Sequence, residues 1–101
     1  MSRHYTVVFT PEAQADLLEL YDYIAEHSSA DRALEYIDRL GKLTSGLASF
    51  PERGTVRDDI RPGLRVIGFE HRVSIAFRVK SEAVTILRIL YAGRDVGGNR
   101  R

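Results

Sequence analysis

Two amphipathic runs with helical periodicity follow each other closely in the first half of the chain, and the short polar break between them constrains the fold more than any other feature. The segment Thr10-Pro11-Glu12 favours a helix start, because threonine caps exposed amide groups, proline suits the first helical position and glutamate complements the helix dipole. The break His27-Ser28-Ser29 offers either serine as the cap of a second helix. A connection this short predicts an antiparallel helical hairpin.

Each run carries one apolar stripe, so one side of the hairpin is expected to face a core. We expect the first helix to run to about Glu26, with Asp16 among the carboxylates on its solvent side. Phe50-Pro51 is expected to end the second helix, because the residue before proline avoids the helical region. Gly41 interrupts that helix at a cost of about 1 kcal/mol relative to alanine, which we interpret as a sign of close approach by another backbone. The apolar positions are Ala13, Leu17, Leu20, Tyr21 and Ile24, then Ala33, Tyr36, Ile37, Leu40, Leu43 and Leu47.

Four short runs rich in β-branched and aromatic residues flank the hairpin, and we expect each to form a strand. One precedes the helices at residues 4–9, and three follow at Leu64–Phe69, 73–79 and 84–91, separated by the short polar breaks typical of β-hairpins. Residues 51–63 contain two prolines and two glycines and are expected to form a long loop. The element order βααβββ predicts an α+β fold, with the antiparallel helical hairpin packed on a small, mainly antiparallel sheet.

Alternation of side chains along the last two strands predicts a basic surface. The core face of the last strand is expected to be Thr85, Leu87, Ile89 and Tyr91. This assignment puts Arg78 and Arg88 on the non-core side of neighbouring strands, where a concave basic patch would bind phosphate. Arg61, Arg65 and Lys80 are expected nearby. The same side chains are equally suited to solubilise an exposed sheet face or to pair with carboxylates.

Length and composition restrict the class of protein further. A chain of 101 residues with 44% hydrophobic content predicts one domain, residues 1–101, around one core. It has no cysteine, no signal peptide and no run near the roughly 20 apolar residues that span a bilayer, so we expect a soluble cytoplasmic protein without a membrane partner. Residues 1–50 hold four basic and eight acidic residues, a net −4, whereas the remainder holds eleven and six, a net +5. Such polarity steers a molecule towards nucleic acid or an acidic protein segment, but a solvated surface carries similar charges.

Motifs for cofactor or metal chemistry are missing from the sequence. His4, His27 and His71 are scattered without metal-ligand spacing. No Walker motif, dinucleotide-binding fingerprint or nucleophile elbow is present. We therefore predict no cofactor and no metal, and we expect a short flexible tail from about residue 96.

Several strings, in their order and spacing, resemble a known family. They are Val8-Phe9-Thr10-Pro11-Glu12-Ala13, Tyr21-Asp22-Tyr23-Ile24-Ala25-Glu26, Ala33 with Tyr36-Ile37, Phe50-Pro51-Glu52-Arg53-Gly54, and Ile86-Leu87-Arg88-Ile89-Leu90-Tyr91-Ala92-Gly93-Arg94-Asp95. Together they are similar to the ParE/RelE superfamily of toxins from type II toxin–antitoxin systems, and within it to ParE. The resemblance covers residues 4–95.

The resemblance implies a toxin held inactive by a cognate ParD-like antitoxin, whose flexible C-terminal segment would wrap the toxin in a hetero-oligomer. Tyr21, Tyr23 and Tyr36 are candidates to contact that segment, and they are equally suited to core packing. Two targets share this fold: ParE toxins poison DNA gyrase, whereas RelE toxins cut messenger RNA on the ribosome.

Residue chemistry favours the first target. An RNA-cutting site needs groups that accept a proton, donate one and stabilise phosphate, and residues 96–101 supply neither tyrosine nor histidine. Tyr91 also stands where relatives often carry histidine. We therefore expect a non-catalytic gyrase inhibitor with Arg65, Arg78, Arg88 and above all Arg94 in contact with the target. The alternatives are a ribosome-dependent endoribonuclease that uses Arg61, Arg65, Tyr91 and Arg94, and a decayed member that only binds its partner or represses its own operon.

Overall fold

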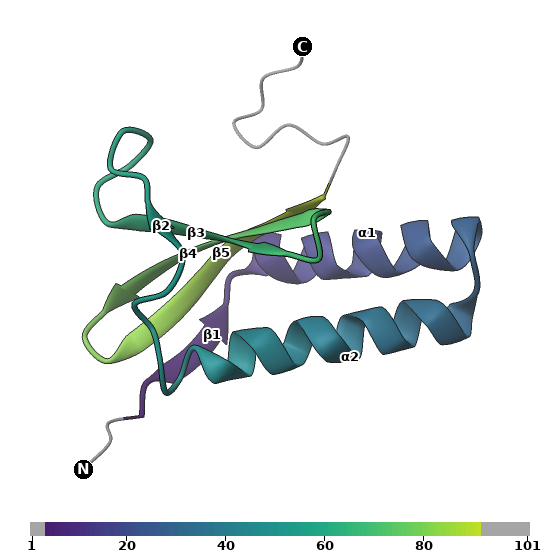
Figure 1. The fold of residues 1–101 in the computed structure, drawn as a ribbon, viewed down its shortest axis with the longest axis horizontal. Coiled ribbons are helices and arrows are strands. Elements are labelled where there is room, and N and C mark those ends of the chain that lie inside the picture. The colour runs from purple at the N-terminus through teal and green to yellow at the C-terminus, as the bar shows by residue number, and fades with distance from the viewer. Residues whose placement is uncertain (1–3, 92–101) are drawn as a thin grey trace.

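The structure, a computed structural model, describes residues 4–91. Its elements are β1 (Thr6–Phe9), α1 (Pro11–His27), α2 (Ala30–Gly46), β2 (Thr55–Val56), β3 (Leu64–Phe69), β4 (Val73–Lys80) and β5 (Ala83–Tyr91). The strands form one sheet in the order β1-β5-β4-β3-β2, in which β1 and β5 are parallel and the other neighbours are antiparallel. Figure 1 shows the helical hairpin packed beside this sheet. The α+β fold and the mainly antiparallel sheet are confirmed, while the predicted tail lies outside the described residues.

Both helix starts form as the sequence predicts. The Thr10 hydroxyl accepts a hydrogen bond from the Ala13 N–H at 3.0 Å and donates to the Leu87 carbonyl at 2.9 Å, which fixes the start of α1 against β5. Of the two serines in the break, Ser29 is the cap of α2 and accepts from the Arg32 N–H at 3.1 Å. The antiparallel hairpin therefore depends on two side-chain caps that are readable in the sequence.

The prediction misplaces some element boundaries and misses one short strand. Helix α2 ends at Gly46 rather than at Phe50, and turns with hydrogen bonds between residues three apart follow it, because glycine gives little support to a helix interior. Strand β1 starts at Thr6 rather than at His4. The expected loop of residues 51–63 contains the short strand β2, which pairs with the start of β3.

Two glycines have opposite roles. At Gly41 a Cβ atom would meet nothing within 4 Å, so the predicted close approach of another backbone is wrong. Gly54 has a φ of +79°, and a Cβ atom there would lie 2.5 Å from the Val66 carbonyl oxygen. The backbone before β2 therefore approaches β3 at a distance that only glycine permits.

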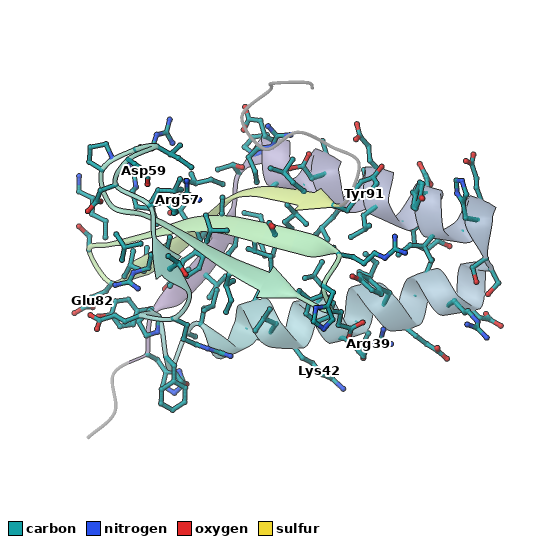
Figure 2. The ribbon with its side chains drawn as sticks, turned by 45° about the horizontal axis from the view of Figure 1, so that its top comes forward. Arg39, Lys42, Arg57, Asp59, Glu82 and Tyr91 are labelled. Atoms are coloured by element: carbon teal, nitrogen blue, oxygen red, sulfur yellow. The ribbon has the colours of Figure 1, made fainter. Side chains whose placement is uncertain are left out.

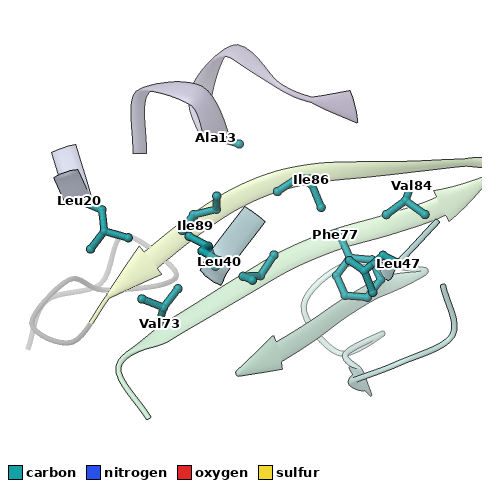
Figure 3. Packing of buried hydrophobic residues seen from close by; sticks show 10 residues of the cluster. Ala13, Leu20, Leu40, Leu47, Val73, Phe77, Val84, Ile86 and Ile89 are labelled. Atoms are coloured by element: carbon teal, nitrogen blue, oxygen red, sulfur yellow. The ribbon is translucent and has the colours of Figure 1, made fainter. Parts of the chain in front are cut away.

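The core lies between the helical hairpin and one face of the sheet. Leu20 of α1, Leu40 of α2 and Phe77 of β4 belong to one buried cluster. Figure 3 shows Phe77 beside Leu47 at one side of this cluster and Leu20 at the other. Phe77 is fully buried and is the largest side chain in this cluster. Burial of each such side chain contributes about 1.5–3 kcal/mol, so the two apolar stripes of the hairpin are fixed by this contact.

A β-bulge shifts the faces of β5. Ala76 lies opposite Arg88 while Phe77 lies opposite Ile86, so Leu87 has no partner in the register. Before the bulge it is Val84 and Ile86 that are fully buried, whereas after it Ile89 enters the core. The predicted core face of β5 is therefore wrong for Thr85 and Leu87 and right for Ile89, because the extra residue reverses the alternation.

Candidate functional site

A groove lies at the end of the molecule where α1 joins α2. Figure 1 shows that the helical hairpin extends past the sheet at this end. The groove encloses about 540 Å³ between the two helices, the β3–β4 turn and the end of β5. We call it the aromatic groove. Its lining includes Tyr23, His27, Arg32, Glu35, Tyr36, Arg39, Glu70, Arg72 and Tyr91.

One wall of the aromatic groove is a row of three rings. The Tyr23 ring stacks on the His27 ring, with 4.1 Å between centroids, and contacts the Tyr91 ring at 5.1 Å. The His27 ring is also held by a 2.8 Å hydrogen bond between Nδ1 and the Tyr23 carbonyl. Aromatic faces of this kind offer a large contact area at a low cost in side-chain entropy.

Tyr36 of α2 also lines the groove and has a buried hydroxyl. Its ring packs edge-on against Phe69, with 5.3 Å between centroids. Its hydroxyl oxygen has no hydrogen-bond partner among the residues that the structure describes. Burial, and to a smaller extent the charge of Glu70, raises the pKa of this phenol. The groove thus has a polar group whose hydrogen bond is not met within residues 4–91.

An arginine–carboxylate pair joins α2 to the β3–β4 turn at the groove rim. Arg39 donates two hydrogen bonds to Glu70, of 2.7 and 2.9 Å, and its guanidinium lies 5.3 Å from the centre of the Tyr36 ring. The hydrogen bond from Arg39 lowers the pKa of the Glu70 carboxyl and raises that of Arg39. Neither residue carried a signal in the sequence, because the pair spans 31 positions.

The turn that presents Glu70 has an unusual backbone. Glu70 and His71 have φ values of 50° and 63°, in the left-handed region that favours glycine and asparagine. Side chains with a Cβ atom reach this region at a cost of about 1–2 kcal/mol per residue. The bidentate pair with Arg39 helps to hold Glu70 in this conformation.

Positive charge exceeds negative charge around the groove. Its lining carries three arginines against two glutamates, and Glu70 is already paired with Arg39. Arg32 and Arg72 form no ion pair within residues 4–91. The aromatic groove therefore combines apolar rings with two arginines whose charge is not neutralised by an ion pair within residues 4–91. This combination suits a peptide with an acidic side chain next to an apolar one.

The tyrosines that we predicted to contact an antitoxin are divided by the structure. Tyr23 of α1 and Tyr36 of α2 both line the aromatic groove, and Tyr91 joins them from β5. Tyr21 is half-buried on α1 and is not part of the groove lining.

Two residues that we predicted to face solvent form a partly buried ion pair instead. Asp16 is 6% exposed and accepts two hydrogen bonds from Arg88, of 2.7 and 3.0 Å. Asp16 lies three residues after Ala13 and four before Leu20, so its place on the apolar stripe of α1 was readable in the sequence. Arg88 is thus bound to α1.

The predicted basic patch is not one surface. Arg65 lies opposite Phe77, whose side chain is in the core, so Arg65 is on the helix side of the sheet. Arg78 is exposed and lies opposite Leu64 and Thr85 on the other side. The sheet therefore separates Arg65 from Arg78, since directly paired residues share a face. Arg88 lies opposite Ala76 and so shares the face of Arg78 as predicted, but it is held by Asp16.

The nuclease set is also dispersed. Tyr91 lies opposite Val73 and Arg65 opposite Phe77, four residues further along β4, so their positions differ by about 13 Å along the strand. Arg61 belongs to the loop between β2 and β3, and Arg94 lies outside the described residues. Within residues 4–91 no group of three or more His, Cys, Asp or Glu side chains is placed to hold a metal. Across the same residues no helix is long and apolar enough to cross a bilayer.

This chain, with two helices on a five-stranded mixed sheet, shares its fold with a protein of a toxin–antitoxin pair. The chain matches a structure of the chromosomal ParDE toxin–antitoxin system from P. aeruginosa with a TM-score of 0.76 and 28% identity, over 87% of this chain and 96% of that one. The family model of the ParE toxin of the type II toxin–antitoxin system parDE matches residues 7–96, and the chain belongs to this family.

Curated relatives agree with this assignment. Toxin ParE1 of Mycobacterium tuberculosis is 31% identical over 100 residues, 98% of this chain and 99% of the relative. Toxin ParE3 of Caulobacter vibrioides is 31% identical over 84 residues, 83% of each chain. The toxin–antitoxin complex RelBE2 of Mycobacterium tuberculosis shares the fold, with a TM-score of 0.64 and 23% identity over 91% of this chain and 95% of that one.

Proposed function

We propose that this ParE-family toxin acts in the cytoplasm, where it blocks replication by inhibiting DNA gyrase, and that a cognate ParD-like antitoxin neutralises it. The match of residues 7–96 to the ParE family carries the proposal. Inhibition by binding requires a surface complementary to the target but no proton transfer, so it needs no set of acid and base side chains.

The separation of Arg65 from Tyr91 supports binding over RNA cutting. A nuclease must bring a proton acceptor, a proton donor and a phosphate-binding cation to one phosphate. Arg65 and Tyr91 start about 13 Å apart along the strand, so they are not neighbours on the sheet, as an acid–base pair within hydrogen-bond reach would be. The experiment has to separate gyrase inhibition from the alternative function, a ribosome-dependent endoribonuclease.

The experiment compares two purified assays with the same toxin preparation. We expect the toxin to inhibit gyrase supercoiling in proportion to its concentration and to leave messenger RNA intact on translating ribosomes. The cognate antitoxin added in equimolar amount should restore supercoiling. Messenger cleavage on ribosomes with unaffected supercoiling would replace the gyrase proposal by the nuclease, and growth without arrest on induction would favour a decayed member.

For the antitoxin, we assign the aromatic groove as the contact surface. Arg32 and Arg72 would pair with carboxylates of the antitoxin segment, while Tyr23 and Tyr91 cover its apolar side chains. Tyr36 would gain a partner for its buried hydroxyl if the segment offers a carbonyl or a carboxylate. Such a disordered segment orders on binding, so its affinity depends on these few anchors.

A further inference from the structure

The loop of residues 57–63 projects from the sheet between β2 and β3, at the end remote from the aromatic groove (Figure 1). Its two ends are paired: the Arg57 N–H donates to the Leu64 carbonyl at 2.7 Å, and the Leu64 N–H donates to the Arg61 carbonyl at 3.0 Å. Inside the loop, the N–H groups of Ile60 and Arg61 both donate to the Arg57 carbonyl, at 3.1 and 3.2 Å. The backbone of the loop is therefore closed on itself.

Polar side chains reinforce this closure. Arg57 donates two hydrogen bonds to Asp59, of 2.9 and 2.8 Å, and Figure 2 shows both residues in the loop. The hydrogen bond from Arg57 lowers the pKa of the Asp59 carboxyl. Asp58 accepts the Gly63 N–H at 2.7 Å. Just before β2, the close approach of Gly54 to Val66 fixes the base of the loop.

None of these contacts uses the apolar side chain at the centre of the loop. Ile60 is 53% exposed, and Val56 in the neighbouring strand β2 is 45% exposed. The loop is thus ordered by polar contacts while its isoleucine stays in water. A partner that covers Ile60 would gain apolar burial with little further loss of loop entropy, which is the property of a pre-organised interface anchor.

Charge defines the chemistry of that partner. Arg57 is neutralised by Asp59, and Asp58 is engaged with the backbone of Gly63, whereas Arg61 forms no ion pair within residues 4–91. Arg61 directly follows Ile60, so the loop offers an apolar anchor next to a cation. An apolar pocket with a carboxylate at its rim is the complementary surface. The exposed Ile60 favours a protein surface over a nucleic acid, because phosphate contacts would use Arg61 and leave the isoleucine uncovered.

We propose that the 57–63 loop docks into the protein that this toxin poisons, with Ile60 buried in an apolar pocket of gyrase and Arg61 paired with a carboxylate at its rim. The identity of the target rests on the proposed function, whereas the role of the loop rests on its own geometry. The 57–63 loop and the aromatic groove lie at opposite ends of the sheet, as the labelled residues Arg57 and Tyr91 show in Figure 2. Target and antitoxin would thus contact separate residues.

The test replaces one exposed aliphatic side chain by glutamine at two sites of the full chain, Ile60→Gln in the loop and Leu18→Gln on α1, where Leu18 is 68% exposed. We expect Ile60→Gln to raise the toxin concentration for half-inhibition of gyrase by about tenfold or more, the scale of an interface anchor. Leu18→Gln should leave it unchanged. Both variants should unfold at the wild-type urea midpoint and bind the antitoxin with wild-type affinity. Arg61→Ala should weaken inhibition about threefold and reduce its dependence on salt.

Several results would overturn the proposal. Equal potency of Ile60→Gln and wild type removes the loop from the interface. A loss of antitoxin affinity in Ile60→Gln makes the loop an antitoxin contact. Inhibition that Arg61→Ala abolishes while Ile60→Gln leaves it intact makes the loop a nucleic-acid contact. If the wild-type toxin leaves gyrase unaffected, the proposed function fails, and growth arrest becomes the measurement. A fully toxic Ile60→Gln variant would then also overturn the role of the loop. Lost toxicity would instead keep the loop as the contact with another target protein.

Discussion

Asp16 and Arg88 are joined by two parallel hydrogen bonds across 72 positions of the sequence. The same carboxylate accepts the backbone N–H of Ile89 at 2.8 Å. The pairing of β1 with β5 stops at Phe9 and Ile86, so Asp16 satisfies a donor on the edge of β5 beyond the end of its strand neighbour. The Asp16 side chain of α1 therefore accepts a hydrogen bond that a neighbouring strand would otherwise accept, and it connects the helix to the sheet.

This relationship predicts the cost of removing Asp16. Asp16→Ala leaves the Arg88 guanidinium and the Ile89 N–H without their acceptor, and we expect it to lower the free energy of unfolding by about 3 kcal/mol. Asp16→Asn keeps one acceptor oxygen and should lose about half as much. Urea unfolding followed by circular dichroism measures both. Asp38→Ala is the control, because Asp38 pairs with Lys42 at 3.5 Å on the exposed surface and should change stability by less than about 0.5 kcal/mol.

The two contrasting glycines give a second prediction. Gly41→Ala fills open space in a helix and should raise the free energy of unfolding by about 1 kcal/mol. Gly54→Ala should lower it by about 2 kcal/mol, because it strains a positive φ and places a methyl group against the Val66 carbonyl. Thermal unfolding of the two variants beside wild type is the measurement, and a destabilised Gly41→Ala would show that the position is crowded.

The aromatic groove can be tested by charge reversal. We expect Arg72→Glu to weaken antitoxin binding about tenfold or more, since it puts a carboxylate where the antitoxin segment is proposed to bring its own. Arg72 has no ion pair within residues 4–91, so the change should leave stability near wild type. Titration calorimetry with the antitoxin peptide measures the affinity.

Lys42→Glu is the matched control for that titration. Lys42 is exposed on α2 and does not line the aromatic groove. It should bind the peptide as wild type does. Equal losses in both variants would point to general attraction between a basic toxin and an acidic peptide and would remove the groove from the antitoxin contact.

Sequence reasoning located what depends on local chemistry. Thr10 and the two serines of the break mark the helix starts because a cap is a contact over three residues. It failed where one residue changed a register: the bulge at Leu87 reverses the faces of β5, and no property of leucine announces it. The pair of Arg39 and Glu70 was equally hidden, because only the packing of a β-turn on a helix brings the two together.

Acid should release the contact between Arg39 and Glu70. The pKa of Glu70 is lowered in the folded state by the hydrogen bond from Arg39, so its contribution to stability is present above the unfolded-state value of about 4.3 and is lost as pH falls through the folded-state pKa. We expect Glu70→Gln to be less stable than wild type at pH 7 and equal to it near pH 2. Urea midpoints of the two proteins across that range measure the difference. A difference that persists at pH 2 would show that the glutamine perturbs the turn for another reason.

Alanine variants of the arginines proposed to contact the target should lose inhibition for two different reasons, loss of stability or loss of a contact with gyrase. Arg88→Ala is expected to abolish toxicity by destabilising the fold, because it removes the partner of the buried Asp16. Arg78→Ala changes an exposed side chain and should weaken gyrase inhibition several-fold while stability and antitoxin affinity stay at wild type. Arg94→Ala should also weaken gyrase inhibition several-fold. Arg65 lies on the helix side of the sheet, so Arg65→Ala should weaken inhibition less than Arg78→Ala if the target covers the opposite face. Supercoiling inhibition and unfolding measured on the same four preparations separate the two mechanisms: a folded, fully inhibitory Arg78→Ala removes that face of the sheet from the target contact.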